Sequence, residues 1–189
     1  DDETAAHLQR MSHYCQLIAL RADLGSDTAE MLRIASPMHD VGKIGIPDDI
    51  LLKPGRLTSE EFELMKQHAE IGYRILSGSQ NDLVQLSARI AQTHHEKWDG
   101  TGYPNNLQAE DIPVEGRVAA VADVFDALTS RRPYKRAWSI TDAVSTLRSG
   151  RGTHFDPTLV DVFLGAMDEV VEIKERFVET DDGEADSAQ

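Results

Sequence analysis

Two adjacent histidines, His94 and His95, open the segment of this chain whose residue types are best suited to chemistry. They lead directly into a loop that contains Gly100, Gly102 and Pro104. Neutral imidazole nitrogens are common metal ligands, and glycine allows a backbone to approach a ligand closely. Adjacent histidines alone are usually surface residues, so a metal site requires further donors elsewhere. The candidate donors in the whole chain are Glu3, His7, His39, Asp40, His68, His94, His95 and Asp123.

The spacing of these candidates favours a cluster of two or three divalent metal ions. Glu3 and His7 are four residues apart, so an α-helix places both on one face. Adjacent residues, such as His39 and Asp40, point roughly 100° apart around a helix. Such neighbours can ligate different metals, or one can ligate while a carboxylate bridges two. Iron, manganese, zinc and nickel accept imidazole and carboxylate together, and the lack of a cysteine among the candidates makes a structural zinc site unexpected.

The histidines also have an ordinary explanation. A solitary histidine on a helix most often binds no ligand, and for that reason His13 and His154 are assigned no function. Asp123 is more informative, because it lies in an apolar helical segment where a buried carboxylate needs a partner. A metal ion would supply that partner, and Asp126, three residues later, is the alternative for the same role.

The charge distribution separates two kinds of phosphate binding. A formal net charge of −14 argues against sequence-independent binding of DNA or RNA, which rests on many lysine and arginine contacts. Positive charge is nevertheless concentrated at residues 131–136, where it could neutralise phosphate oxygens. In isolation this cluster would be read as a solvated helix C-terminus. Lys43, close to His39 and Asp40, is the best single candidate for contacting a substrate phosphate beside metals.

The elements that must position these residues are predicted to be helices joined by short loops. Residues 41–55 are expected to be irregular because glycine and proline recur there. The expected helical segments are about 3–23, 27–40 with a capping box at Asp27 and Glu30, 58–75 with a capping box at Thr58 and Glu61, 82–95, 114–130, one capped by Ser139, and one from the N-cap Asp156 to about Phe177. The fold class is therefore predicted to be an all-α helical bundle of about seven helices.

The chain is predicted to be one catalytic domain over residues 1–178, followed by an acidic disordered tail at 179–189. The sequence begins at Asp1 rather than methionine, which is consistent with an upstream regulatory domain outside it. Cys15 cannot form an internal disulfide and lies in an apolar stretch, so a buried thiol in a reducing compartment is expected. No apolar run reaches the length of a membrane span, so a cytoplasmic location is expected.

The motifs of this chain resemble those of a known family. The run His39-Asp40-Val41-Gly42-Lys43 matches the HD signature of the HD phosphohydrolases. Residues 94–104 match the extended motif of the HD-GYP subfamily. The resemblance continues through residues 44–47, 53–55, 123–129 and 132–135, and it covers roughly residues 3–164.

This resemblance implies an all-helical bundle around a non-haem metal centre, commonly of iron, with manganese or nickel as alternatives. It also implies hydrolysis of the bacterial second messenger cyclic di-GMP to linear pGpG. All eight candidate donors would be metal ligands, with Asp40 as the bridging carboxylate and Asp40 and Lys43 as the catalytic residues. Glu3 would hold a third metal, and the reaction could then continue to GMP. The implied substrate contacts are Lys43, Gly102, Tyr103, Arg132 and Lys135.

By the same resemblance, the loop at residues 102–104 would meet diguanylate cyclase (GGDEF) domains, and a homodimer is a further expectation. Two alternative functions stay open. One is a catalytically weak sensor that binds cyclic dinucleotides, although the complete set of candidate ligands argues against it. The other is a hydrolase of another cyclic dinucleotide such as cyclic GMP-AMP, because base preference depends on pocket shape rather than on these motifs.

Overall fold

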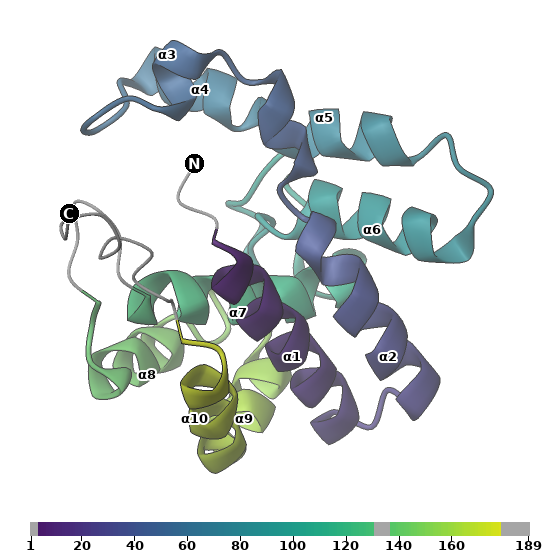
Figure 1. Ribbon diagram of the computed structural model, residues 1–189, viewed down its shortest axis with the longest axis vertical. Helices are drawn as coiled ribbons and strands as arrows, with labels where there is room; N and C mark the ends of the chain where they lie inside the picture. The colour runs from purple at the N-terminus through teal and green to yellow at the C-terminus, as the bar shows by residue number, and fades with distance from the viewer. Residues whose placement is uncertain (1–3, 131–136, 179–189) are drawn as a thin grey trace, which may run out of the picture.

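The computed structural model describes residues 4–130 and 137–178 (Figure 1). Glu3, Arg132, Lys135 and the predicted tail at 179–189 lie outside these residues. The α-helices are α1 (Ala5–Arg21), α2 (Ser26–Ala35), α3 (Asp48–Leu51), α4 (Ser59–Met65), α5 (Gln67–Leu76), α6 (Asp82–Thr93), α7 (Val114–Thr129), α8 (Ile140–Ser149), α9 (Pro157–Gly165) and α10 (Met167–Arg176). Three short 3-10 helices lie between them: η1 (Ser36–Met38), η2 (Val41–Gly45) and η3 (Ala109–Asp111).

The fold is all-α, as the sequence predicted. Within the described ranges, β-type pairing is limited to one isolated bridge between Arg151 and Phe155. No helix described by the structure combines the length and the apolar character needed to cross a bilayer.

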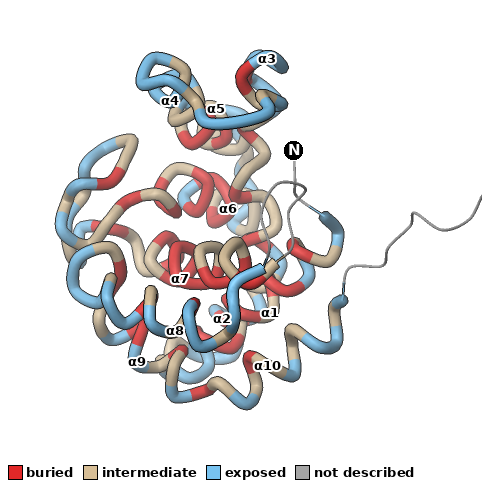
Figure 2. Tube along the Cα trace, turned by 90° about the vertical axis from the view of Figure 1, so that its left-hand side faces the viewer, coloured by how far each residue is buried: buried red, intermediate tan, exposed pale blue. Residues whose placement is uncertain are grey.

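α7 is the central helix, and α1, α6, α8 and α9 pack around it (Figure 2). Its residues 118–122 are small alanines and valines and are buried, which lets the surrounding helices approach closely. The rings of Tyr14 in α1, Phe125 in α7 and Phe163 in α9 meet edge to face, with centroids 5.0 to 5.9 Å apart. This core fixes α1 against α7, and both helices carry candidate metal ligands.

A second close contact joins η2 to α5. A Cβ atom at Gly42 would overlap the carbonyl oxygen of His68 and the backbone of Gly72. The absence of side chains at Gly42 and Gly72 therefore lets the two backbones touch. As a result, the segment that carries Asp40 lies directly beside the start of α5, which carries His68.

Most of the predicted helix starts are confirmed. Thr58 and Glu61 form a reciprocal capping box at α4, and the Ser139 side chain accepts a hydrogen bond from the Asp142 amide at α8. Asp156 caps α9. Asp27, however, is not an N-cap. α2 begins one residue earlier at Ser26, and Asp27 lies in its first turn, where a negative charge is favourable.

The predicted set of about seven helices corresponds to ten α-helical segments in the described residues. The short helix α3 forms within the stretch that was expected to be irregular. The predicted third helix is interrupted at Lys66, and the predicted last helix is interrupted at Ala166. Gly165 weakens the helix before that second interruption, and the acidic Asp168 and Glu169 favour a new helix start after it.

Candidate metal centre

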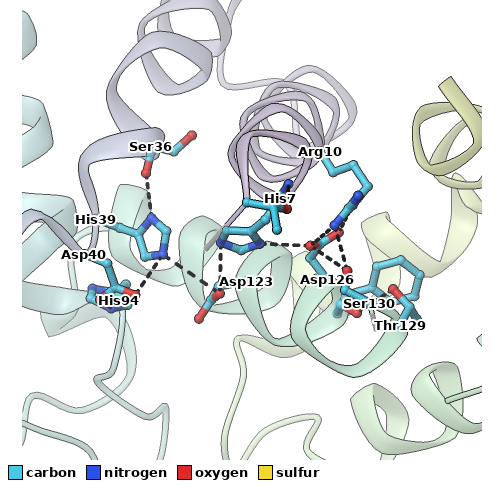
Figure 3. Close-up of polar contacts among 12 residues, drawn as sticks. His7, Arg10, Ser36, His39, Asp40, His94, Asp123, Asp126, Thr129 and Ser130 are labelled. Atoms are coloured by element: carbon cyan, nitrogen blue, oxygen red, sulfur yellow. Dashed lines mark hydrogen bonds and ion pairs between the residues drawn. The ribbon is translucent and has the colours of Figure 1, made fainter. Parts of the chain in front are cut away.

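Seven of the eight predicted metal ligands lie together, drawn from five separate parts of the chain. His7 comes from the first turn of α1 and Asp123 from the middle of α7 (Figure 3). His68 lies in the first turn of α5. The donors form two groups, and the ligand atoms within each group lie within 4.8 Å of one another. The first group is His7, His39 and Asp123, and the second group is Asp40, His68, His94 and His95. Glu3 lies outside the described residues.

Backbone carbonyl groups orient three of the imidazole rings. Nδ1 of His39 lies 3.0 Å from the Ser36 carbonyl oxygen, and Nδ1 of His68 lies 2.6 Å from that of Met65. Nδ1 of His94 lies 3.0 Å from the Ala91 carbonyl oxygen. A carbonyl oxygen only accepts hydrogen bonds, so each Nδ1 must carry the proton. Each Nε2 therefore presents a lone pair, which is the form that ligates a metal.

These Nε2 atoms surround the carboxylate of Asp40. Asp40 Oδ1 lies 3.1 Å from His68 Nε2 and 3.5 Å from His94 Nε2. Oδ2 lies 3.3 Å from His39 Nε2 and 2.8 Å from Lys43 Nζ. Although close, Asp40 Oδ1 and the Nε2 atoms of His68 and His94 are buried and make no hydrogen bond to any described residue. Lone pairs that face one another in a buried site are costly unless a cation lies between them, so these residues fit a metal ion.

The ionisation of the second group also suits a metal. Burial lowers the pKa of His94, and burial together with the adjacent imidazoles lowers the pKa of His95 well below its usual range. At neutral pH these two histidines are therefore neutral, as metal coordination requires.

In the first group, Asp123 rather than Asp126 faces the histidines. Asp123 Oδ1 lies 4.0 Å from Nε2 of both His7 and His39. Asp126 lies on the other side of the His7 ring, with Oδ2 2.9 Å from His7 Nδ1, and it forms a buried ion pair with Arg10 (Figure 3). Burial raises the pKa of Asp126, but hydrogen bonds from His7 and Arg10 outweigh burial and lower it. The two aspartates of α7 thus have different surroundings, one beside the donors and one behind them.

The loop at residues 102–104 borders the second group. The Tyr103 ring lies 4.7 Å from the His95 ring, measured between centroids. A Cβ atom at Gly102 would overlap the backbone of Glu96 and Lys97, so glycine is required for this close approach. The buried Glu96 carboxylate accepts hydrogen bonds from the amides of Asn105 and Leu107, at 2.7 and 3.1 Å, and so closes the loop. Gly102 and Tyr103 therefore lie at the edge of the donor cluster.

Most residues that support the donors were not assigned a role from the sequence, and Asp126 was considered only as the alternative to Asp123. Arg10, Asp126 and Glu96 hold His7 or the loop, and Phe62 and Lys66 of the α4–α5 region lie against Tyr103. Glu96 lies within the motif at residues 94–104, so its type and position were a signal that the sequence did contain. Arg10 and Asp126 are separated by 116 residues, and no sequence spacing relates them.

A family model described as HD domain matches residues 2–159. The chain is 52% identical over 164 residues to the cyclic di-GMP phosphodiesterase response regulator RpfG of Xanthomonas campestris, covering 87% of this chain and 43% of that protein. It is 48% identical over 172 residues to the 3'3'-cGAMP-specific phosphodiesterase 2 of Vibrio cholerae, covering 91% and 33%. It is 47% identical over 176 residues to a cyclic di-GMP phosphodiesterase of Thermotoga maritima, covering 93% and 48%. The chain thus spans a third to about half of the length of these relatives.

Two solved structures share the fold. A cyclic GMP-AMP specific phosphodiesterase of Vibrio cholerae (V-cGAP3) matches with a TM-score of 0.67 and 19% identity, over 90% of this chain and 48% of that chain. A HDG"Y"P protein of Bdellovibrio bacteriovorus also matches with a TM-score of 0.67, at 17% identity over 86% of this chain and 51% of that chain. On the match of its family model, and with the HD and GYP motifs at its cluster of buried donors, this chain belongs to the HD domain family.

Proposed function

We propose that this chain is a metal-dependent phosphodiesterase that hydrolyses cyclic di-GMP to linear pGpG. One observation carries the proposal: Asp40 stands between two groups of buried nitrogen and oxygen donors, with one carboxylate oxygen toward each side. Relatives that are 52% and 47% identical to this chain are named cyclic di-GMP phosphodiesterases, which supports this choice of substrate.

His7, His39 and Asp123 would hold one metal ion, and His68, His94 and His95 would hold a second, with Asp40 bridging both. Two divalent ions held this way lower the pKa of a bound water molecule and neutralise charge on a phosphodiester. We infer that iron is the resident metal, with manganese or nickel as substitutes, because the resemblance to the HD-GYP subfamily implies iron. The donors are imidazole and carboxylate without a thiolate, a set that accepts all three metals. A site at Glu3 for a third metal, and with it continued hydrolysis to GMP, is a further part of the proposal.

The residues around the donors would bind and orient the substrate. Lys43 Nζ lies 2.8 Å from Asp40 Oδ2, so its positive charge is held at the position where a non-bridging phosphate oxygen would meet the metal site. Tyr103, beside His95, offers an aromatic face to a nucleobase. Gly102, Arg132 and Lys135 are proposed as the remaining substrate contacts.

A second substrate has support of its own. The relative that is 48% identical over 91% of this chain is named a 3'3'-cGAMP-specific phosphodiesterase. Cyclic GMP-AMP carries the same phosphodiester bonds, so the same donors and Lys43 could serve its hydrolysis. The two activities differ in the pocket that receives the bases, and not in the metal chemistry.

Partners and location are proposed more briefly. The loop at residues 102–104 could also contact diguanylate cyclase domains, and a homodimer is expected. The buried free thiol of Cys15 is consistent with action in the reducing cytoplasm.

The test of this proposal is a comparison of kcat/KM for cyclic di-GMP and for 3'3'-cGAMP, with protein that is prepared anaerobically and analysed for metal content per chain. We expect at least two metal ions per chain and a higher kcat/KM for cyclic di-GMP. Hydrolysis of 3'3'-cGAMP alone would replace the substrate and keep the mechanism. Binding of cyclic di-GMP without turnover by metal-loaded protein would instead favour the sensor.

The Glu3→Ala variant tests the third metal site. That site is contradicted if the metal content per chain and the end product do not change.

A further inference from the structure

Arg10 and Asp126 form an ion pair in the interior of the protein. Arg10 Nε lies 2.6 Å from Asp126 Oδ1, and Arg10 Nη2 lies 2.9 Å from Asp126 Oδ2. The residues are 2% and 0% exposed, so water screens neither charge. A buried ion pair of this kind is seldom a net gain in stability, because removing both charges from water costs about as much as their attraction returns. The pair therefore calls for another explanation.

The explanation lies in the His7 ring. Asp126 Oδ2 is 2.9 Å from His7 Nδ1, and a carboxylate that is ionised beside Arg10 can only accept a hydrogen bond. His7 Nδ1 must therefore carry the proton, and His7 Nε2 presents its lone pair toward Asp123 (Figure 3). His39, His68 and His94 obtain the same tautomer from backbone carbonyl groups, whereas His7 obtains it from a side chain.

Arg10 connects this arrangement to two other elements. Its Nη2 donates to Ser130 Oγ at 2.7 Å, just after the end of α7. Its Nη1 donates to the Phe177 carbonyl oxygen at 2.8 Å, at the end of α10. One guanidinium group therefore fixes Asp126 and joins α1 to the ends of both α7 and α10.

We propose that Arg10 and Asp126 are positioning residues for the metal centre, which set the tautomer and direction of His7 so that the first donor group binds its metal. The proposal rests on the metal binding of the proposed function. It assigns the ionised Asp126 a role that a backbone carbonyl could not fill equally well, because a carboxylate acceptor also makes His7 Nε2 more basic and a better ligand. The loss of this acceptor should weaken metal binding by the first donor group and leave metal binding by the second group unchanged.

The experiment separates positioning from stability with two variants of the full chain. Asp126→Asn keeps an oxygen that can accept from His7 but removes the negative charge beside the buried Arg10 guanidinium. The double variant Arg10→Met with Asp126→Leu removes both charges and the acceptor while it keeps apolar volume. Metal-free protein is titrated with Co²⁺, whose absorption bands report ligation, and its thermal unfolding is measured in parallel. His7→Ala and His95→Ala identify which binding step belongs to the first and which to the second group.

We expect the two measurements to rank the proteins differently. Asp126→Asn should unfold at the lowest temperature, and the double variant should unfold close to wild type. The double variant should nevertheless show the weakest Co²⁺ binding at the first-group step, about 10- to 100-fold below wild type, with the second-group step unchanged. The ¹⁵N shifts of the His7 ring should show loss of the Nδ1-protonated tautomer in the double variant.

The control is Asp156→Asn, which breaks the ion pair of Asp156 with Arg117, 2.7 Å long, but keeps an N-cap side chain on α9. It should alter unfolding and leave both Co²⁺ steps as in wild type. The proposal is overturned if the double variant binds Co²⁺ as wild type does, or if affinity follows stability through the series. Wild-type protein that binds no Co²⁺ would overturn the proposed function as well. If the double variant does not fold, Asp126→Asn decides the matter by whether its first-group step weakens selectively.

Discussion

Asp40 is the residue at which the two donor groups meet. Its surroundings are of the residue types, imidazole and carboxylate, that suggested a metal site in the sequence. Three histidine Nε2 atoms approach its two oxygens, and backbone carbonyl groups fix the rings of all three histidines. The sequence predicted these residues as candidate donors because imidazole and carboxylate side chains recur in family-specific patterns, and the structure brings seven of the eight together. It could not predict the support of His7, since Arg10 and Asp126 acquire their roles only through the packing of α1 against α7.

At this scale we predict that Lys43→Met lowers kcat by about 10²-fold or more, because a positive charge at the phosphate is lost where charge develops in the reaction. Metal content should stay as in wild type. Steady-state kinetics and metal analysis of the same preparation check this. Arg151→Met, which breaks the exposed pair of Arg151 with Asp161, is the control and should leave kcat unchanged. A Lys43→Met protein with wild-type kcat would show that this lysine does not act on the substrate.

At the scale of the elements, features set by neighbouring residues could be predicted from the sequence, whereas features set by tertiary contacts could not. The caps at Thr58, Ser139 and Asp156 were predictable because each depends on residues within three positions along the chain. The helix interruption at Lys66 was not predictable. It lies at the α4–α5 junction, where the His68 ring hydrogen-bonds to the Met65 carbonyl oxygen. Gly42 was expected only as part of an irregular stretch, although with Gly72 of α5 it forms the contact that brings Asp40 to His68.

Gly42→Ala tests that contact. The added methyl group would overlap the His68 carbonyl oxygen and the Gly72 backbone, so η2 must move away from α5. We expect a loss of about 1 to 3 kcal/mol in the free energy of unfolding and weaker metal binding. Denaturant unfolding of the metal-free protein measures the first effect, and Co²⁺ titration the second. Gly78→Ala is the matched control, because a Cβ atom there meets nothing within 4 Å. Equal behaviour of the two variants would contradict the importance of this contact.

The segment that joins α8 to α9 offers a test by pH. Burial lowers the pKa of His154 to about 4, whereas an unfolded histidine titrates near 6.5. Between these pH values the unfolded chain binds a proton that the folded protein excludes, so stability is lost as pH falls from about 6.5 towards 4. Over this pH range, we expect the free energy of unfolding of His154→Asn to fall by about 1 to 2 kcal/mol less than that of wild type. Parallel pH dependence of unfolding for both proteins would show that His154 is not held neutral by the fold.

At the scale of the whole molecule, the candidate donors come from α1, α5, α7, the η1–η2 junction and the end of α6. The candidate metal centre therefore brings together elements that are distant in the sequence. The all-α class followed from helical periodicity. The spacing of the candidate donors favoured a cluster, whereas the way these five segments meet depends on packing around α7, which helical periodicity does not report. Metal that binds only the folded protein stabilises it by mass action.

Chelation should therefore lower the unfolding temperature of the whole protein. With free metal at about 100 times its dissociation constant, the stabilisation is about 2.7 kcal/mol. For a chain of this length this corresponds to a shift of about 5 to 10 °C. Thermal unfolding with and without chelator measures it, and Asp40→Asn, which lacks the bridging carboxylate, should respond much less. If the chelator leaves the unfolding temperature of the wild-type protein unchanged, the prediction of a bound, stabilising metal is contradicted.

The central claim is that this cluster of donors hydrolyses cyclic di-GMP with the help of bound metal. The most direct measurement identifies the products of cyclic di-GMP after incubation with three samples: anaerobically metal-loaded wild type, the same protein after chelation, and metal-treated Asp40→Asn. We predict linear pGpG from the first sample alone, with activity restored to the second when metal is returned. Intact cyclic di-GMP in the first sample, or equal hydrolysis in all three, would contradict the claim.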